Sequence, residues 1–308
     1  MAPRTRPEPL LLRQLSYLVA LAKERHFARA AASVNITQPA LSAAIRQLED
    51  ELGVMLVERD KRFNGFTPEG QEVLLWARRM LADENSLRQG ILNARRSLTG
   101  NLRLGVIPSA LPLVPAITDP LHDRHPQVKV TVWSTSSIEI QKGLDQFELD
   151  AGITYLESEP LHGVLVRELY VERYVLLTPE QGPLGGRNSA TWREAADLPL
   201  CLLTPNMQNR RILDGVFKSL ECSPRPQLET NSVVNLCAHV RSGRLSSIVP
   251  KTLIQVLGMP SGAIALDLVA PEVERKVGLI VPNREPLPPI SLALFSLQFP
   301  GFNGADVG

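Results

Sequence analysis

The 308-residue sequence has only three cysteines and no long apolar run, and each shortage excludes a class of protein. A membrane-spanning helix needs about 18 consecutive apolar residues, and no such run is present. The N-terminus lacks an apolar stretch followed by a small-residue cleavage site, so we expect a cytoplasmic protein. Cys201, Cys222 and Cys237 are spaced like neither a zinc site nor a disulfide framework, which predicts buried free thiols. Redox sensing stays open, although no basic cluster near Cys201 or Cys222 marks a reactive thiol.

Signatures of catalysis are also missing. The five histidines include one closely spaced pair, His122 and His125, which precedes Pro126 in a loop-like context that does not favour a metal site. No nucleophile elbow, phosphate-binding loop or dinucleotide fingerprint occurs. We therefore expect no catalytic residues, no metal and no cofactor, and hence no enzyme.

The formal net charge of +1 hides an uneven distribution of charged residues. Residues 1–100 hold 15 Lys and Arg against 11 Asp and Glu, a net charge of +4, whereas the remainder holds 18 against 21, a net charge of −3. Positive charge therefore collects in the N-terminal third, where it favours contact with nucleic-acid phosphates.

Three helices are predicted in this third from apolar residues at helical spacing. The first covers about residues 10–23, and the second starts near Phe27. Thr37 is placed to cap a third helix with Pro39 in its first turn, and Gly53 is placed to end it. The apolar face of the third helix consists of Leu41, Ile45, Leu48 and Leu52, and its polar face of Gln38, Ser42, Arg46 and Glu49.

Two short helices joined by a tight turn, with a polar outer face on the second, make a helix-turn-helix. Amide and guanidinium side chains on that face can read base edges in the major groove of DNA. A small helical bundle is the alternative that the apolar pattern alone leaves open.

This region resembles the DNA-binding signature of LysR-type transcriptional regulators. The resemblance rests on Phe27-Ala28-Arg29-Ala30-Ala31, Thr37-Gln38-Pro39-Ala40-Leu41-Ser42, Ile45-Arg46-Gln47-Leu48-Glu49 and Leu52-Gly53. It continues through Leu56-Val57-Glu58-Arg59 and Phe66-Thr67-Pro68-Glu69-Gly70, which are similar to the family's wing and the start of its linker helix. The order and spacing of these segments favour the regulator over the small bundle.

The resemblance implies a DNA-binding role for the matching positions. They are Arg29, Thr37, Gln38, Pro39, Ala40, Ser42, Arg46, Arg59, Lys61 and Arg62. Gln38 and Ser42 would read bases, whereas Arg59 and Arg62 of the wing would contact phosphate. For each position the alternative is a solvated surface side chain. Ala43 stands where the family commonly has a more polar residue, so it offers only apolar contact, for example to a thymine methyl group.

A strict heptad follows the wing. Thr67 is placed to cap a helix, after which apolar residues alternate in steps of four and three as far as Thr99-Gly100. The predicted seam is Val73, Ala77, Met80, Glu84, Leu87, Ile91, Ala94 and Leu98. At about 1.5 Å per residue such a helix is a rod of roughly 45 Å, longer than one small domain needs. We predict that it dimerises the chain, chiefly through Val73, Ala77, Met80, Leu87 and Ile91. The alternative is a long helix packed on the chain's own C-terminal domain.

After the heptad the pattern changes to short strands that alternate with helices. Strands at 102–107, 128–132 and 150–154 give a β-α-β-α-β order and hence a parallel sheet. Pro120, inside the first intervening helix, predicts a kink or a shorter helix. A crossover strand near 174–177 leads to a second unit, and the chain returns through 277–280.

This order of elements resembles the two-lobed periplasmic-binding-protein fold of LysR-type effector domains. The predicted fold is an α+β N-terminal winged helix-turn-helix with a long linker helix, followed by an α/β two-lobed domain. The predicted limits are 1–66 for the winged helix-turn-helix, 67–99 for the linker helix and 100–308 for the effector-binding domain. Lobe I would cover about 100–170 and 272–308, and lobe II about 171–271.

The family binds its inducer between the lobes, where carboxyl ends of parallel strands meet helix N-termini. The candidate ligand contacts are Ser109, Thr135, Ser136, Thr204, Asn206 and Asn231. Hydroxyl groups and free backbone N–H groups favour an anion or a carboxylate. Ordinary capping of helix N-termini by the same residue types is the alternative.

These predictions describe a sequence-specific transcriptional regulator that acts as a homodimer or as a tetramer of two dimers. Its predicted partners are double-stranded promoter DNA, a small-molecule inducer, further copies of itself and RNA polymerase, with no membrane partner. A periplasmic solute-binding protein is the alternative for the C-terminal two-thirds, but it needs the signal peptide that the N-terminus lacks.

Overall fold

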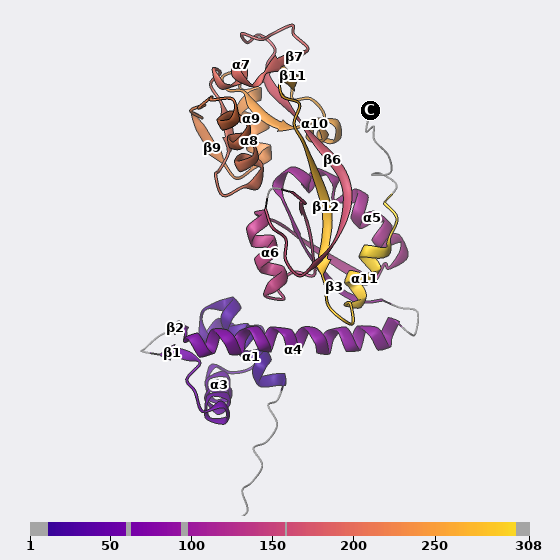
Figure 1. Ribbon diagram of the computed structural model, residues 1–308. Coiled ribbons are helices and arrows are strands. Elements are labelled where there is room, and N and C mark those ends of the chain that lie inside the picture. The colour runs from indigo at the N-terminus through magenta and orange to yellow at the C-terminus, as the bar shows by residue number, and fades with distance from the viewer. Residues whose placement is uncertain (1–11, 60–62, 94–97, 158, 300–308) are drawn as a thin grey trace, which may run out of the picture. The chain divides into compact units, whose positions relative to one another are not determined.

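A computed structural model of the protein describes residues 12–59, 63–93, 98–157 and 159–299. The chain divides into two compact units, residues 1–95 with 146–148 and residues 96–145 with 149–308. Figure 1 labels many of the elements of both. Within the described ranges, no helix is both long enough and apolar enough to cross a membrane.

The first unit begins with a cluster of short helices and a two-stranded wing. α1 (Leu12–Glu24), α2 (Phe27–Ser33) and α3 (Gln38–Leu52) pack through apolar residues at helical spacing. β1 (Val57–Arg59) then pairs antiparallel with β2 (Phe63–Phe66). The tight turn between α2 and α3 and the following hairpin confirm the predicted winged helix-turn-helix.

The residues that the sequence predicted as caps set the two ends of α3. Thr37 Oγ1 accepts a hydrogen bond from the backbone N–H of Ala40, with 3.4 Å between nitrogen and oxygen. Pro39 lies in the first turn. Gly53 adopts the left-handed region at φ +71°, which glycine reaches without the steric cost that a Cβ atom adds.

One long helix, α4 (Pro68–Asn93), follows the wing and packs along α1 (Figure 1). Thr67 Oγ1 accepts from the backbone N–H of Gly70 at 2.9 Å and donates to the carbonyl of Met55 at 2.6 Å, which confirms the predicted cap. Ala94 of the predicted seam lies outside the described residues. Leu98 is not helical and packs in the core of the second unit. The predicted continuation of the seam to Leu98 is therefore wrong, because this side chain is already buried.

The second unit is built on an eight-stranded sheet that starts with three parallel strands. β3 (Gly100–Val106) pairs with β4 (Val128–Ser134) on one side and β5 (Ala151–Tyr155) on the other, as predicted. A 3-10 helix, η1 (Pro108–Leu113), precedes α5 (Pro115–Arg124), and α6 (Ser137–Asp145) precedes β5. The first predicted helix is therefore interrupted, but the interruption lies near Val114, and α5 continues through Pro120.

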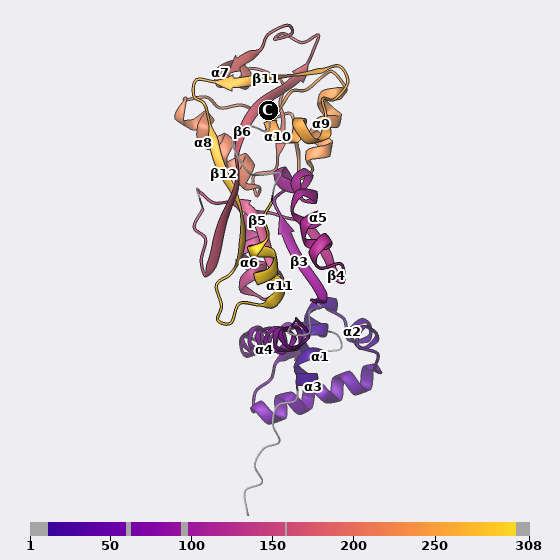
Figure 2. The same ribbon diagram turned by 90° about the vertical axis from the view of Figure 1, so that its right-hand side faces the viewer.

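Two long strands carry the chain between the two halves of this unit. β6 (Val164–Pro179) and β12 (Glu274–Pro282) pair antiparallel and lie side by side (Figure 2). β12 also pairs with β5, while β6 also pairs with β10 (Ser247–Pro250) and β11 (Ala263–Val269). These strands confirm the predicted crossover and return of the chain, and with them the two-lobed fold.

The remaining elements complete the second half and close the first. They are β7 (Ser189–Thr191), α7 (Trp192–Ala196), β8 (Cys201–Leu203), α8 (Gln208–Ser219), β9 (Leu228–Thr230), α9 (Val233–Arg241), α10 (Lys251–Leu257) and α11 (Pro289–Ser296). β8 and β9 form a separate parallel pair. The rings of Trp192 and Phe217 meet edge to face, with centroids 5.5 Å apart, and anchor α7 to α8 in the core.

Candidate DNA interface and effector site

The solvent side of α3 carries polar side chains that the sequence predicted to read DNA. Leu41 and Ile45 are fully buried against the neighbouring helices, which turns the opposite side of the helix outward. The exposed or half-buried residues there are Thr37, Gln38, Pro39, Ala40, Ser42 and Arg46. A helix face of amide, hydroxyl and guanidinium groups is the type of surface that reads the major groove.

The remaining predicted DNA contacts lie on α2 and in the wing. Arg29 donates from Nη2 to the backbone carbonyl of Glu24 at 2.8 Å, and its Nε lies 3.7 Å from the Glu24 carboxylate. The backbone of Arg59 is in register with Phe63 across the hairpin. The side chain of Arg59, and all of Lys61 and Arg62, lie outside the described residues. Their contacts stay predictions.

Glu49 corrects the predicted polar face of α3. Its side chain is buried rather than exposed, and Oε1 accepts hydrogen bonds from the backbone N–H groups of Leu56 (2.9 Å) and Val57 (3.1 Å). A carboxylate that accepts two backbone hydrogen bonds ties α3 to the start of the wing. Helical spacing alone placed Glu49 on the exposed polar face, but the chain folds back over that side of α3 and buries it.

The predicted seam of α4 has a covered part and an open part. Val73 and Ala77 pack in the core of the first unit. Met80, Leu87 and Ile91 are 45%, 66% and 56% exposed, respectively. Trp76, which the four-three spacing passes over in favour of Ala77, is also exposed and lies one turn before Met80. The apolar stripe that one chain leaves uncovered is therefore Trp76, Met80, Leu87 and Ile91.

Ser109, Thr135 and Ser136 lie together at the carboxyl ends of β3 and β4. Thr135 Oγ1 donates to Glu139 Oε2, and the same oxygen accepts from Ser136 Oγ at 2.9 Å and from the Ser136 backbone N–H at 3.1 Å. These bonds, led by that of the Thr135 hydroxyl, lower the pKa of Glu139. An internal carboxylate thus occupies the N-terminal end of α6, where Ser136 acts as an ordinary N-cap.

Thr204, Asn206 and Asn231 lie at the carboxyl ends of β8 and β9. The backbone N–H of Thr204 donates to the carbonyl of Thr230 at 2.9 Å, which holds the two loops together. Thr204 Oγ1 is buried and has no hydrogen-bond partner among the described residues. Met207, at the N-cap position before α8, supplies no side-chain cap, and both asparagines are exposed. The first N–H groups of this helix are thus not bonded by a capping side chain.

Tyr155 is the centre of a buried cluster that joins both halves of the second unit. Its hydroxyl lies 3.2 Å from Ser109 Oγ and accepts from Asn209 Nδ2 of α8 at 3.2 Å. It donates to the carboxylate of Glu172 on β6 and accepts from the hydroxyl of Tyr174 at 3.4 Å. Ser109 is therefore held inside this cluster, where it is 2% exposed.

Glu172 is a fully buried carboxyl group. Burial raises its pKa to about 7, and the hydrogen bonds of its neighbours, led by that of Tyr155, oppose this rise only in part. Burial also raises the pKa of Tyr155 and Tyr174 well above the usual range, so their hydroxyls stay protonated. Sequence reasoning missed this cluster. Its only local signal was the alternation of Tyr170, Glu172 and Tyr174 on one face of a strand.

The three cysteines are free, but only Cys201 is as buried as predicted. Burial raises the pKa of the Cys201 thiol to about 11 and also raises that of Cys237. Cys222 is half-buried, and Nη1 of Arg193 lies 3.8 Å from its sulfur. Sequence reasoning missed this basic neighbour because 29 residues separate the two.

Comparison with known families accounts for both units. Residues 12–71 match the bacterial regulatory helix-turn-helix protein, lysR family, and residues 95–297 match the LysR substrate binding domain. The chain belongs to the LysR family. This LysR-type protein is a DNA-binding transcriptional regulator with an effector-binding domain, and it is not an enzyme.

The regulator resembles its relatives over most of its length. It is 31% identical over 277 residues to the DNA-binding transcriptional dual regulator OxyR of Escherichia coli (strain K12), with 90% of each chain covered. It is 32% identical over 273 residues to a probable hydrogen peroxide-inducible genes activator of Streptomyces viridosporus, which covers 87% of this chain and 86% of the relative. A full-length OxyR variant from Pseudomonas aeruginosa has a TM-score of 0.74 at 26% identity, covering 97% of this chain and 99% of the other.

Proposed function

We propose that this LysR-type regulator binds promoter DNA as a homodimer or a tetramer of two dimers, in the cytoplasm and together with RNA polymerase. A small anionic or carboxylate inducer, bound between the lobes of the second unit, controls it. The observation that carries the inducer proposal is the uncapped N-terminal end of α8, with the Thr204 hydroxyl beside it, which has no partner in the part of the chain that the structure describes. An anion there satisfies open N–H groups and meets the positive end of the helix dipole.

DNA reading is assigned to the start of α3 and to basic residues around it. Gln38 and Ser42 face bases, and Arg46 follows two turns after Gln38 on the exposed side of the helix. Arg29, Arg59, Lys61 and Arg62 are the proposed phosphate contacts. The exposure of Gln38 and Arg46 on a helix whose other face is buried supports this assignment.

Dimerisation is assigned to the uncovered stripe of α4. Leu87→Asp places a charge where an apolar side chain should meet the partner helix, and an unpaired buried charge is strongly unfavourable. Sedimentation of the full-length variant should show a smaller species with weak operator binding. Asn85→Asp adds the same charge at an exposed position off the stripe and should leave the assembly intact. An unchanged oligomer in Leu87→Asp contradicts the proposed seam.

The inducer site is tested by thermal shift of the full-length protein with a panel of small carboxylates. A ligand at one hundred times its dissociation constant stabilises the folded state by about 2.7 kcal/mol and raises the melting temperature. Thr204→Ala should remove this rise. Thr118→Ala, which deletes a hydroxyl bonded to the carbonyl of Val114, should keep it.

The lobe I candidates do not bind the anion in this proposal. Ser109, Thr135 and Ser136 are bonded within the protein, so they form a wall of the site, and the anion itself is bound at α8. Asn206 and Asn231 are exposed at the rim. A panel in which no carboxylate binds, or in which Thr204→Ala responds like the parent, refutes the site.

Peroxide sensing is a second candidate, because one relative is named a probable hydrogen peroxide-inducible genes activator. The raised pKa of Cys201 and of Cys237 argues against it, since the thiolate is the reactive form. Cys222, beside Arg193, is the thiol to test. A change in operator binding after peroxide treatment that disappears in Cys222→Ser supports peroxide sensing. An unresponsive parent protein favours the anionic inducer.

A further inference from the structure

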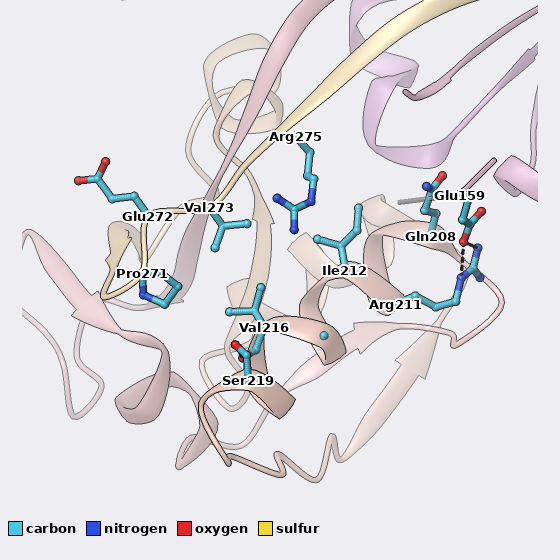
Figure 3. Close-up of a pocket in the computed structure, with 11 residues that line it drawn as sticks. Glu159, Gln208, Arg211, Ile212, Val216, Ser219, Pro271, Glu272, Val273 and Arg275 are labelled. Carbon is cyan, nitrogen blue, oxygen red and sulfur yellow. Dashed lines mark hydrogen bonds and ion pairs between the residues drawn. The ribbon is translucent and has the colours of Figure 1, made fainter. Parts of the chain in front are cut away.

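A groove of about 650 Å³ runs along one face of α8, beside the segment that joins β11 to β12 (Figure 3). The residues of α8 that line it recur at intervals of three and four residues, so they lie on a single face of the helix. The residues that matter for the argument are Gln208, Arg211, Ile212, Val216, Val273 and Arg275. The volume falls in the range of about 300–1,000 Å³ that is typical of small-molecule sites.

Two buried polar atoms of the groove residues have no hydrogen-bond partner among the described parts of the chain. Gln208 is 3% exposed, and its Nε2 donates to the carbonyl of Glu157 at 3.0 Å, while its Oε1 accepts no hydrogen bond. The Nε of Arg275 is buried and donates no hydrogen bond. Buried polar groups are normally paired, so an open acceptor and an open donor in one groove point to a bound molecule that completes both.

Arg275 is also the cation of this groove that has no ion pair with a described residue. Arg211 pairs with Glu159, and Glu272 is exposed. Nη1 of Arg275 donates to the backbone carbonyl of Glu274 at 2.6 Å, which positions the guanidinium without neutralising it. Figure 3 shows the Arg275 side chain reaching from its strand toward Ile212 on α8.

The groove is apolar along the same helix face. Ile212 and Val216 are 6% and 7% exposed, respectively, and Val273 lines the opposite wall. The groove has a guanidinium on one wall, aliphatic side chains along its length and an amide oxygen at the start of α8. It therefore suits a molecule with an anionic group, an apolar body and a hydrogen-bond donor. An inorganic anion alone leaves the aliphatic part of the groove empty.

We propose that this groove is a second ligand site, which binds a small organic acid with an apolar body and a hydroxyl or amide donor. The carboxylate binds the guanidinium of Arg275, the apolar body covers Ile212 and Val216, and the donor bonds to Gln208 Oε1. Thr204 does not line this groove, so the groove differs from the proposed inducer contact there and adds a second input to the regulator. The β11–β12 segment returns the chain to the first half of the unit, so a ligand held against it biases the arrangement of the two halves.

Calorimetric titration of the full-length protein tests the proposal with three related probes. 4-Hydroxyphenylacetate has all three parts, phenylacetate lacks the donor, and 4-hydroxyphenylethanol lacks the carboxylate. We expect 4-hydroxyphenylacetate to bind once per chain and at least about tenfold more tightly than either comparison compound, because each lacks one hydrogen-bonded group. Binding of none of the three overturns the proposal.

Variants locate the binding. Arg275→Ala should weaken 4-hydroxyphenylacetate at least about tenfold, whereas Arg225→Ala, which removes an exposed arginine of the same unit, should not. Gln208→Leu should abolish the preference for 4-hydroxyphenylacetate over phenylacetate and thereby tests the site without removing a charge. Equal binding by the parent, Arg275→Ala and Gln208→Leu places the probe elsewhere and refutes the groove. Thr204→Ala should leave this binding unchanged, so failure of the inducer site and failure of the groove are distinguishable.

Discussion

In the DNA-reading unit, Gln38 and Arg46 lie exposed on a helix whose opposite face is buried, whereas in the effector unit three of the six polar candidates have side chains bonded within the protein. Ser109 bonds to Tyr155, and Thr135 bonds to Glu139. DNA supplies its own donors, acceptors and charges, so its reader keeps side chains free. A sensor with two halves has to hold them together and leaves few groups open. Removing a polar side chain should therefore change affinity in the first unit and stability in the second.

The largest expected effect is on stability in the second unit, and it comes from the buried Glu172. Its raised pKa means that the folded protein holds the proton more tightly than the unfolded chain does. The resulting stability is complete below about pH 4.5 and is lost as the pH rises through about 7, a difference of about 3 kcal/mol. Glu172→Gln should lose that pH dependence in urea unfolding of the full-length protein at pH 5 and pH 8.

Glu168→Gln is the matched control for this prediction, because Glu168 is exposed on the same strand and pairs with Lys276 at 2.9 Å. It should keep the pH dependence of the parent. A Glu172→Gln profile that follows the parent across this range shows that the carboxyl group titrates normally in the folded state.

In the DNA-binding unit we expect the opposite, a change in DNA affinity with little change in stability. Gln38→Ala should weaken specific operator binding by about 1–3 kcal/mol and relax base preference, because an amide that reads a base edge is lost. The free energy of unfolding should change by less than about 0.5 kcal/mol, since the side chain is exposed. Fluorescence anisotropy with operator and scrambled duplexes measures the first effect, and urea unfolding measures the second.

Gln47→Ala is the corresponding control on α3. Gln47 is exposed, and its amide bonds to Glu51 on the same helix at 3.0 Å. It should leave operator affinity close to that of the parent. If the two glutamine variants bind alike, Gln38 does not read a base.

The smallest effect is expected at the N-terminal end of α6. Ser136→Ala removes an N-cap and should lower the free energy of unfolding by about 1 kcal/mol. Ser134→Ala, at an exposed position two residues earlier, should have almost no effect. Equal stability of the two variants in urea unfolding means that Ser136 contributes no cap. Ser136 would then be available to a ligand, and the contrast between the two units would weaken.

Features that depend on neighbours within a few residues were predictable. The caps Thr37, Gly53 and Thr67 are where the sequence placed them, and the strands of the parallel sheet follow from short apolar runs. The exposed polar face of α3 was predictable for the same reason, because it is one face of one helix. The resemblance to LysR-type regulators also rests on this local region.

The buried cluster around Tyr155 was not predicted from the sequence, because its residues come from elements far apart in the chain. Tyr155 on β5, Glu172 on β6 and Asn209 on α8 meet only after the strands have crossed between the halves. Arg193 and Cys222 show the same limit. Hydroxyl residues at strand ends were correctly placed near helix N-termini, but their internal partners were not foreseen.

The sequence by itself determined the two units, the family and the exposed polar face of α3, because periodicity, capping and charge act over a few residues. Only the tertiary structure decided which polar groups stay free. The chain folds over Glu49, and Ala77 is buried in the core where α1 packs on α4, whereas Thr204 Oγ1 and the groove atoms of Gln208 and Arg275 have no partners among the described residues. The physical reason is that burial and hydrogen bonding depend on what packs against a side chain, and those neighbours come from distant parts of the sequence.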